Sequence, residues 1–192
     1  CLNGLNCKAQ KKQGVMHFCS RKAMDIDGLG EKIVDQLLEA KLIDGFSDIF
    51  GLKKEQLVKL ERFAEKSAEN LIEAIEKSKN TTLARLIYAL GIRNVGESTA
   101  SDLAQHFKSI EKIKTATIEE LEEVDDIGPT VSKSINQYFN DKSKYNQIIS
   151  ILNMGVVFEK IKNTKENREL KGLTFVLTGT LPSLKREEAK SL

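Results

Sequence analysis

The sequence predicts a mainly α-helical protein built from four units of helix, short hairpin and helix, arranged as two pairs. One observation is a five-residue pattern (apolar residue, any two residues, apolar residue, small residue) that occurs four times at nearly constant spacing. Another is that apolar residues at helical spacing follow each copy. The chain has 192 residues, 40% of them hydrophobic, which is enough for one or two small cores.

Hairpins 1 to 4 are the segments 26–30, 60–64, 92–96 and 124–128, and their last residues lie 34, 32 and 32 positions apart. A small residue stands four positions after each hairpin and a larger apolar residue seven positions after it, which predicts one buried helix stripe in each unit. These stripe residues are Val34 and Leu37, Ala68 and Leu71, Ala100 and Leu103, and Ser132 and Ile135.

A second set of helices is expected before the hairpins, at residues 15–24, 53–60, 83–90 and 118–124. The last of these starts with Thr117 and Glu120, which are spaced as a capping box.

The glycines of a hairpin suit an anion site. A glycine at the third position permits a positive φ, and one at the fifth lets the backbone approach a neighbouring surface. The unpaired amides and the positive dipole end of the following helix would then face that surface. Such a site suits a phosphodiester oxygen and contacts only the nucleic-acid backbone, without reading bases.

The four hairpins do not fit this chemistry equally. Hairpin 1 has glycine at both positions, whereas hairpins 3 and 4 have Asn94 and Asp126 at the third position, two residue types that tolerate left-handed geometry. Hairpin 2 has Arg62 and Ala64, so we expect it only to pack. The candidate phosphate-binding residues are Gly28, Leu29, Gly30, Lys32, Arg93, Asn94, Val95, Gly96, Ile127, Gly128 and Lys133.

Composition limits the classes of function. With 30 basic and 28 acidic residues the net charge is +2, so any contact with an anionic polymer must be local. Aromatic residues make up 6% and tryptophan is absent, which disfavours a single-strand binder that stacks bases. The longest apolar run, 86–92, is too short to cross a bilayer, so we expect a soluble, cytoplasmic protein.

All three cysteines lie within the first nineteen residues, which is not a disulfide framework and indicates reduced thiols or metal ligands. Cys19 is expected to be a buried thiol, because its stretch also fits helix packing. His106 is expected to be an ordinary helix residue beside Phe107.

The segments 21–26, 28–30 and 91–96 resemble the helix-hairpin-helix domain of bacterial NAD-dependent DNA ligase, and the likeness covers nearly the whole chain. It implies four regions. They are a zinc-finger remnant at 1–13, expected as a short irregular cysteine segment, a helix-hairpin-helix DNA-binding domain at 14–162, a linker at 163–171 and a truncated α/β BRCT domain at 172–192.

The resemblance also implies cofactors. Cys1 and Cys7 correspond to the second half of a four-cysteine zinc finger, so the zinc site would be incomplete here. The parent enzyme would use NAD and magnesium. The segment 173–181 is similar to the first strand of a BRCT domain, followed by the start of a helix.

In the parent, this region would clamp nicked double-stranded DNA without sequence preference during replication and repair, as a monomer near the bacterial nucleoid. The family places AMP on a lysine in a Lys-x-Asp-Gly motif, and the sequence contains none, so this chain alone should not ligate. The segment 41–45 has one residue too many to be that motif. The alternatives are a stand-alone helix-hairpin-helix DNA-binding module and a protein-interaction scaffold.

Overall fold

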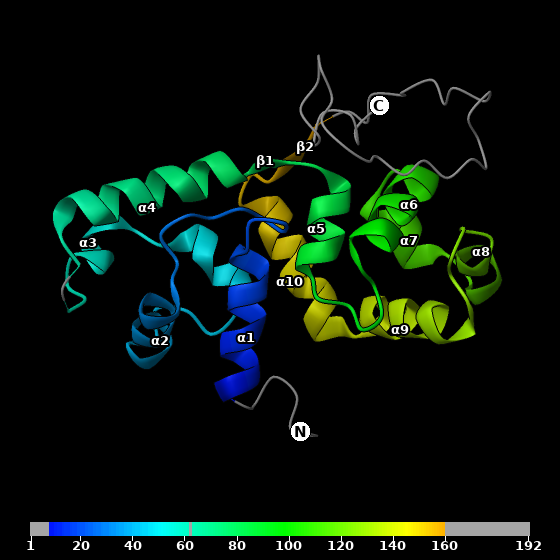
Figure 1. The fold of residues 1–192 in the computed structure, drawn as a ribbon, viewed down its shortest axis with the longest axis horizontal. Helices are drawn as coiled ribbons and strands as arrows, with labels where there is room; N and C mark the ends of the chain where they lie inside the picture. The colour runs from blue at the N-terminus through cyan, green and yellow to red at the C-terminus, as the bar shows by residue number, and fades with distance from the viewer. Residues whose placement is uncertain (1–7, 62, 160–192) are drawn as a thin grey trace, which may run out of the picture. The chain divides into compact units, whose positions relative to one another are not determined.

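A computed structural model describes residues 8–61 and 63–159 of the chain (Figure 1). These residues belong to one compact unit, Cys1–Ile161, and the second unit lies outside them. The elements are α1 (Lys8–Cys19), α2 (Glu31–Glu39), the 3₁₀ helix η2 (Phe46–Gly51), α3 (Lys54–Leu57), α4 (Glu65–Ser78), β1 (Asn80–Thr81), α5 (Leu83–Ala89), α6 (Glu97–Phe107), α7 (Ile110–Thr115), α8 (Ile118–Glu122), α9 (Pro129–Asn140), α10 (Lys142–Asn153) and β2 (Val157–Phe158).

The mainly helical fold is as predicted, and it follows from the stripe pattern. All eight stripe residues are almost completely buried, at 0% or 1% exposure. Small residues at the first stripe position allow the helices to approach closely, and the larger residues one turn later fill the core.

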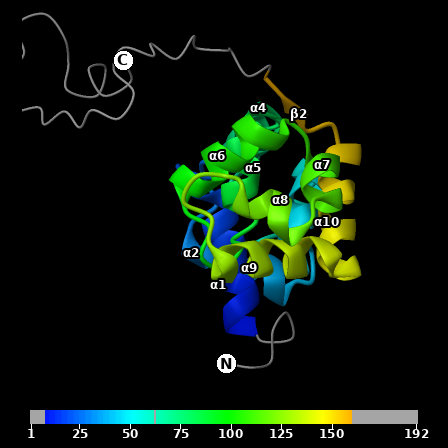
Figure 2. The same cartoon turned by 90° about the vertical axis from the view of Figure 1, so that its right-hand side faces the viewer.

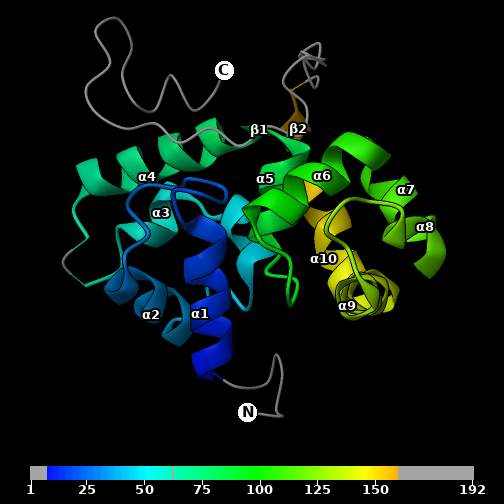
Figure 3. The same cartoon turned by 45° about the vertical axis from the view of Figure 1, so that its right-hand side comes forward.

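The helices are arranged in two groups around a middle set. In Figure 1, α2, α3 and α4 lie on the left, α6 to α9 lie on the right, and α1, α5 and α10 lie between them. Figure 2, seen from the right-hand side, brings α8 and α9 toward the viewer, and Figure 3 shows α9 nearly end-on. Helix α1 contacts both α2 and α5, and α10 contacts both α9 and η2.

A single hydrophobic cluster includes residues from both groups of helices. Within it, the ring of Phe18 in α1 stacks on Phe46 at 4.7 Å and meets Phe50 edge-on at 6.0 Å. Burial of such large rings contributes strongly to stability. The core therefore joins the two groups of hairpins.

Two short strands also join these groups. β1 pairs with β2 in parallel, with Asn80 opposite Val157 and Thr81 opposite Phe158. The amides of Val157 and Glu159 donate to the carbonyls of Lys79 and Thr81, both at 2.9 Å. The segment between the two groups is thus tied to the end of α10.

The bounds of the first helix differ from the prediction of 15–24. Helix α1 is Lys8–Cys19, so residues 8–13 are helical and do not form an irregular cysteine segment. Residues 20–24 form a turn, because the amides of Met24 and Ile26 donate to the carbonyls of Phe18 and Cys19, each at 3.0 Å. These bonds close the helix and reverse the chain before hairpin 1.

Helices α3 and α8 are shorter than the predicted ranges 53–60 and 118–124. After α3, the amides of Lys59 and Leu60 bond to carbonyls three residues back, which tightens the chain into turns. The cysteine pair at positions 1 and 7, the linker at 163–171 and the BRCT-like segment lie outside the described residues.

Candidate nucleic-acid interface

The third position of the hairpins has the left-handed backbone that the sequence predicts. Gly28, Asn94 and Asp126 have φ values of +91°, +65° and +62°. Asparagine and aspartate accept this conformation more readily than other residues with a Cβ, which explains their presence in hairpins 3 and 4. Arg62, at the corresponding position of hairpin 2, lies outside the described residues.

The fifth position is extended in all four hairpins. Gly30, Gly96 and Gly128 have φ values of −71°, −91° and −91°, and Ala64 has −68°. These angles do not require glycine. Within the described part of the chain, a Cβ built at any of the three glycines has no heavy atom within 4 Å. Internal packing therefore does not explain these glycines, whereas close approach of a partner would.

Each fifth residue is also the residue immediately before a helix, at the start of α2, α4, α6 or α9. Among the described residues, none of these four supplies a side-chain cap to the helix that follows. Other helices differ in this respect, because α5, α7, α8 and α10 are capped by the side chains of Thr82, Ser109, Thr117 and Asp141. The first-turn amides after the hairpins thus remain available to an external acceptor.

The apolar positions of the hairpins hold the turns in the core. Their side chains are buried in hairpins 1, 3 and 4, at 3% to 8% exposure, and half-buried at Leu60 and Phe63 in hairpin 2. Leu29, Val95 and Ile127 can therefore contribute only their backbone to a partner. The buried residues are Ile26, Leu29, Ile92, Val95, Val124 and Ile127.

The three predicted cations lie around the hairpins. Lys32 is the second residue of α2, Arg93 lies in the turn of hairpin 3, and Lys133 lies in the second turn of α9. All three are exposed, and none forms an ion pair with a carboxylate of the described residues. Their positive charges are therefore available to an external anion.

Three further lysines were not found from the sequence. Helices α2, α4 and α6 each begin with a glutamate, and a lysine from an earlier part of the chain pairs with it. These pairs are Lys12 with Glu31 at 2.9 Å, Lys54 with Glu65 at 2.8 Å, and Lys22 with Glu97 at 2.6 Å. A carboxylate at the first helical position is stabilised by the helix dipole, but it would repel a phosphate bound at the same place. The paired lysine neutralises the charge of the carboxylate.

We expect Lys22 to support DNA binding by neutralising Glu97. Lys22→Met should weaken duplex binding about two- to fivefold, as for a screened surface charge, and Lys22→Met combined with Glu97→Gln should restore it. Fluorescence anisotropy with a labelled duplex measures this. If the loss persists in the double variant, Lys22 contacts phosphate directly and our assignment is wrong.

Arg85 joins the chain before hairpin 1 to the helix before hairpin 3. Its Nε donates to the carbonyl of Ala23 at 2.7 Å, and its Nη2 donates to that of Arg21 at 2.6 Å. The carboxylate of Asp25 lies 3.8 Å from the same Nη2. From α1, His17 Nε2 donates to the carbonyl of Tyr88 in α5 at 2.8 Å. Hairpins 1 and 3 are thus held by a shared set of contacts.

The predicted metal ligands Cys1 and Cys7 lie outside the described residues. Within residues 8–61 and 63–159, no three His, Cys, Asp or Glu side chains lie close enough to hold a metal ion. Cys19 is buried as expected, and burial raises the pKa of its thiol to about 12. His106 is an exposed residue of α6 whose ring contacts Phe107.

The raised pKa of Cys19 predicts slow thiol chemistry. In a Cys1→Ser, Cys7→Ser variant, Cys19 is the only thiol, and at pH 8 almost none of it is thiolate. We expect labelling by a thiol reagent to be at least roughly a hundredfold slower in the native protein than in the unfolded protein. Equally fast labelling in both states would contradict the buried position.

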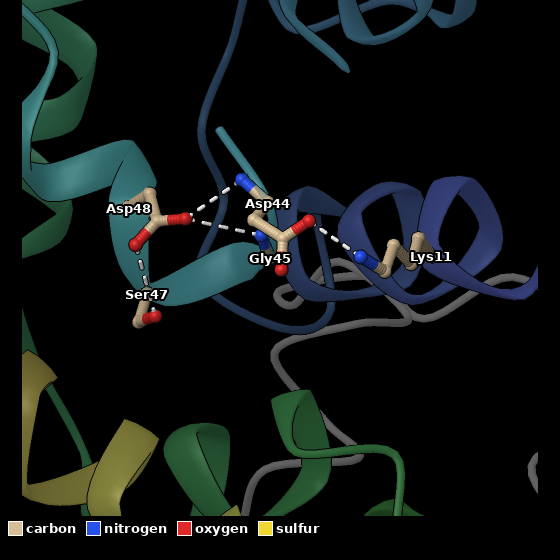
Figure 4. A network of polar contacts seen from close by, with 5 residues as sticks. All are labelled: Lys11, Asp44, Gly45, Ser47 and Asp48. Atoms are coloured by element: carbon tan, nitrogen blue, oxygen red, sulfur yellow. Dashed lines mark hydrogen bonds and ion pairs between the residues drawn. The ribbon is translucent and has the colours of Figure 1, made fainter. Parts of the chain in front are cut away.

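The segment that nearly matches the adenylation motif has a structural role. Asp48 accepts hydrogen bonds from the amides of Asp44 and Gly45 at 2.7 and 3.1 Å, which caps η2 (Figure 4). The carboxylate of Asp44 also pairs with Lys11 of α1, as Figure 4 shows. These contacts fix α1 against the start of η2.

Comparison with known families supports this arrangement of hairpins. Residues 20–77 match the SAM-like helix-hairpin-helix tandem, and residues 85–149 match the helix-hairpin-helix motif. The first match contains hairpins 1 and 2, and the second contains hairpins 3 and 4. The fold and both matches define tandem helix-hairpin-helix motifs.

These motifs support a DNA-binding domain and double-stranded DNA as its general class of partner. None of the helices within the described ranges combines the length and apolar character needed to cross a membrane.

Proposed function

We propose that this chain is the DNA-binding part of an NAD-dependent DNA ligase that holds nicked duplex DNA through its backbone phosphates. The observation that carries this proposal is shared by hairpins 1, 3 and 4. Each combines a left-handed third residue with an exposed glycine at the start of a helix. Around these glycines, the described residues leave open the space that a Cβ would face.

The proposed contact uses backbone groups. A phosphate oxygen accepts hydrogen bonds from the first-turn amides of α2, α6 and α9, and the helix dipoles favour its negative charge. Lys32, Arg93 and Lys133 add local positive charge around these sites. Because no base edge is contacted, the duplex is held without sequence preference, which suits an enzyme that must accept any nick.

We propose four repeats that act as two pairs. The two family matches, each containing two hairpins, support the pairing. Hairpin 2 has the same extended residue before its helix, but that residue is Ala64, whose Cβ would stand between the backbone and a phosphate. We therefore assign hairpin 2 to packing and the other three to DNA.

The ligase assignment extends to groups outside the described residues. Cys1 and Cys7 would supply two of the four zinc ligands, and residues 172–192 would begin a BRCT domain. The adenylated lysine, NAD and magnesium would belong to the rest of the parent enzyme. We propose a cytoplasmic, monomeric protein that acts in replication and repair.

The coding sequence upstream of Cys1 tests the ligase assignment. A second cysteine pair and a Lys-x-Asp-Gly motif there would support it. The product of the whole gene, incubated with adenine-labelled NAD, should then carry labelled AMP on a lysine. A start codon immediately before Cys1 would refute the assignment.

A stand-alone helix-hairpin-helix DNA-binding module is the second candidate, because both family matches describe such motifs and neither implies a ligase. It predicts that the upstream sequence lacks the motif while the chain still binds duplex DNA. A protein-interaction scaffold predicts no duplex binding at any salt concentration.

A further inference from the structure

A groove of about 1060 Å³ lies beside the turn of hairpin 3. Its walls come from α1, the start of η2, the end of α5 and the segment after it, α9 and α10. Two candidate DNA-binding residues, Arg93 and Asn94, line it, and Thr130 and Ser134 from the first two turns of α9 line another part. The groove therefore runs between hairpin 3 and the helix that follows hairpin 4.

The chemistry of the groove differs from that of the chain as a whole. The sequence has 28 acidic residues, yet no carboxylate is among the described residues that line the groove. Arg93 and Lys144 supply positive charge. The ammonium of Lys144 lies 4.9 Å from the centre of the Tyr138 ring and 4.0 Å from the carboxylate of Asp141, a residue that is not part of the lining. The remaining polar lining is mostly side-chain amides and hydroxyls, which can hydrogen-bond to phosphate and sugar oxygens.

Three acidic residues of α6 and of the segment before hairpin 4's glycine line another hollow. Asp102, Glu123 and Asp125 line a space of about 260 Å³ that shares no residue with the groove. The pKa of Asp102 is raised, mainly by burial of its carboxyl group and to a smaller extent by the nearby carboxylate of Asp126. The acidic turn of hairpin 4 thus faces α6, while the first turns of α9 face the groove.

We propose that this groove holds a stretch of the sugar-phosphate backbone of the bound duplex, continuing the contact from hairpin 3 to α9. The inference rests on the proposed function and adds a second contact region to it. A lining with two cationic side chains and, among the described residues, no carboxylate complements a phosphodiester chain. Continuity with Arg93 and Asn94 selects the same DNA molecule as the occupant. The separate acidic hollow takes Asp125 of hairpin 4 away from the groove.

A pair of variants with equal net charge tests the groove. Gln137→Glu places a carboxylate in the groove, and Gln105→Glu places one in the acidic hollow. Both residues are exposed on helices, and glutamate has nearly the same helix propensity as glutamine, so neither change should unfold the protein. Thermal unfolding checks that the two variants are equally stable.

We expect Gln137→Glu to weaken duplex binding about three- to tenfold and Gln105→Glu less than about twofold, measured by anisotropy. Lys144→Gln should make the slope of log affinity against log salt concentration less negative by about one.

If the wild type binds duplex but both glutamate variants bind equally well, the groove proposal is overturned while the hairpin proposal stands. If the wild type binds no duplex, the proposed function itself fails.

Discussion

Gly96→Val is expected to weaken duplex binding roughly ten- to a hundredfold. The valine side chain would keep the phosphate away from the first-turn amides of α6, and a hydrogen bond to a charged acceptor contributes about 1.5 to 3 kcal/mol. The backbone at Gly96 is extended, with φ −91° and ψ −176°, so valine can adopt it. Within the described part of the molecule, its Cβ meets no heavy atom within 4 Å. The loss of affinity would therefore come from the partner surface, and not from strain in the protein.

Ala64→Val is the matched control, because Ala64 has the same place before α4 and a similar φ of −68°. We expect it to change duplex affinity less than about twofold, since hairpin 2 is assigned to packing. Gly96→Val also loses glycine at a helix N-cap, at a cost of up to about 1 kcal/mol, so unfolding must be measured beside binding. Equal losses of affinity in the two variants would refute the ranking of the hairpins.

Gly28 cannot serve in this comparison. Its φ of +91° is a conformation that residues with a Cβ rarely adopt, and a Cβ there would contact Leu71 at 3.6 Å. A substitution at Gly28 would change stability and binding together, whereas one at Gly96 separates the two.

Leu103→Ala is expected to lower the free energy of unfolding by about 2 to 5 kcal/mol, as for other fully buried leucines. The side chain is 0% exposed and lies on the buried stripe of α6. Because one hydrophobic cluster includes both groups of helices, unfolding should remain a single transition. Denaturant titration followed by circular dichroism measures both quantities.

Val58→Ala is the control for this change, since Val58 is 40% exposed and should alter stability by less than about 0.5 kcal/mol. Two separate transitions in Leu103→Ala would contradict a shared core. They would mean that the two pairs of hairpins fold independently.

The predictions that succeeded rest on patterns within a few residues. The buried stripes, the left-handed residues Asn94 and Asp126, and the helices that begin after the fifth hairpin residues follow from spacing and local backbone preference. The capping box of Thr117 and Glu120 is also local and forms as predicted. Such features need no knowledge of the rest of the fold.

The features that the sequence did not predict depend on distant parts of the chain. The Lys22 and Glu97 pair joins residues 75 positions apart, and Arg85 bonds to carbonyls 62 and 64 positions away. A two-residue strand such as β1 is too short to show an alternating pattern. The sequence predicts a helix that continues to residue 24, whereas α1 ends at Cys19. Apolar residues continue past this end, into a turn that is formed by backbone hydrogen bonds to the carbonyls of Phe18 and Cys19.

The groove illustrates the same limit. Its lining residues come from α1, α9 and α10 as well as from the turn of hairpin 3. Among the described residues that line the groove none is a carboxylate, and this becomes visible only when the fold brings these segments together. The acidic run between 119 and 126 is visible in the sequence, but only the fold shows that Glu123 and Asp125 line a separate hollow.

The salt dependence of duplex binding tests the central claim most directly. If hairpins 1, 3 and 4 with their lysines and arginine neutralise about four to six phosphates, the logarithm of affinity should fall with the logarithm of salt concentration with a slope of about −4 to −5. The slope should be the same for duplexes of unrelated sequence, because only the DNA backbone is contacted. A slope near zero would contradict phosphate binding by the hairpins.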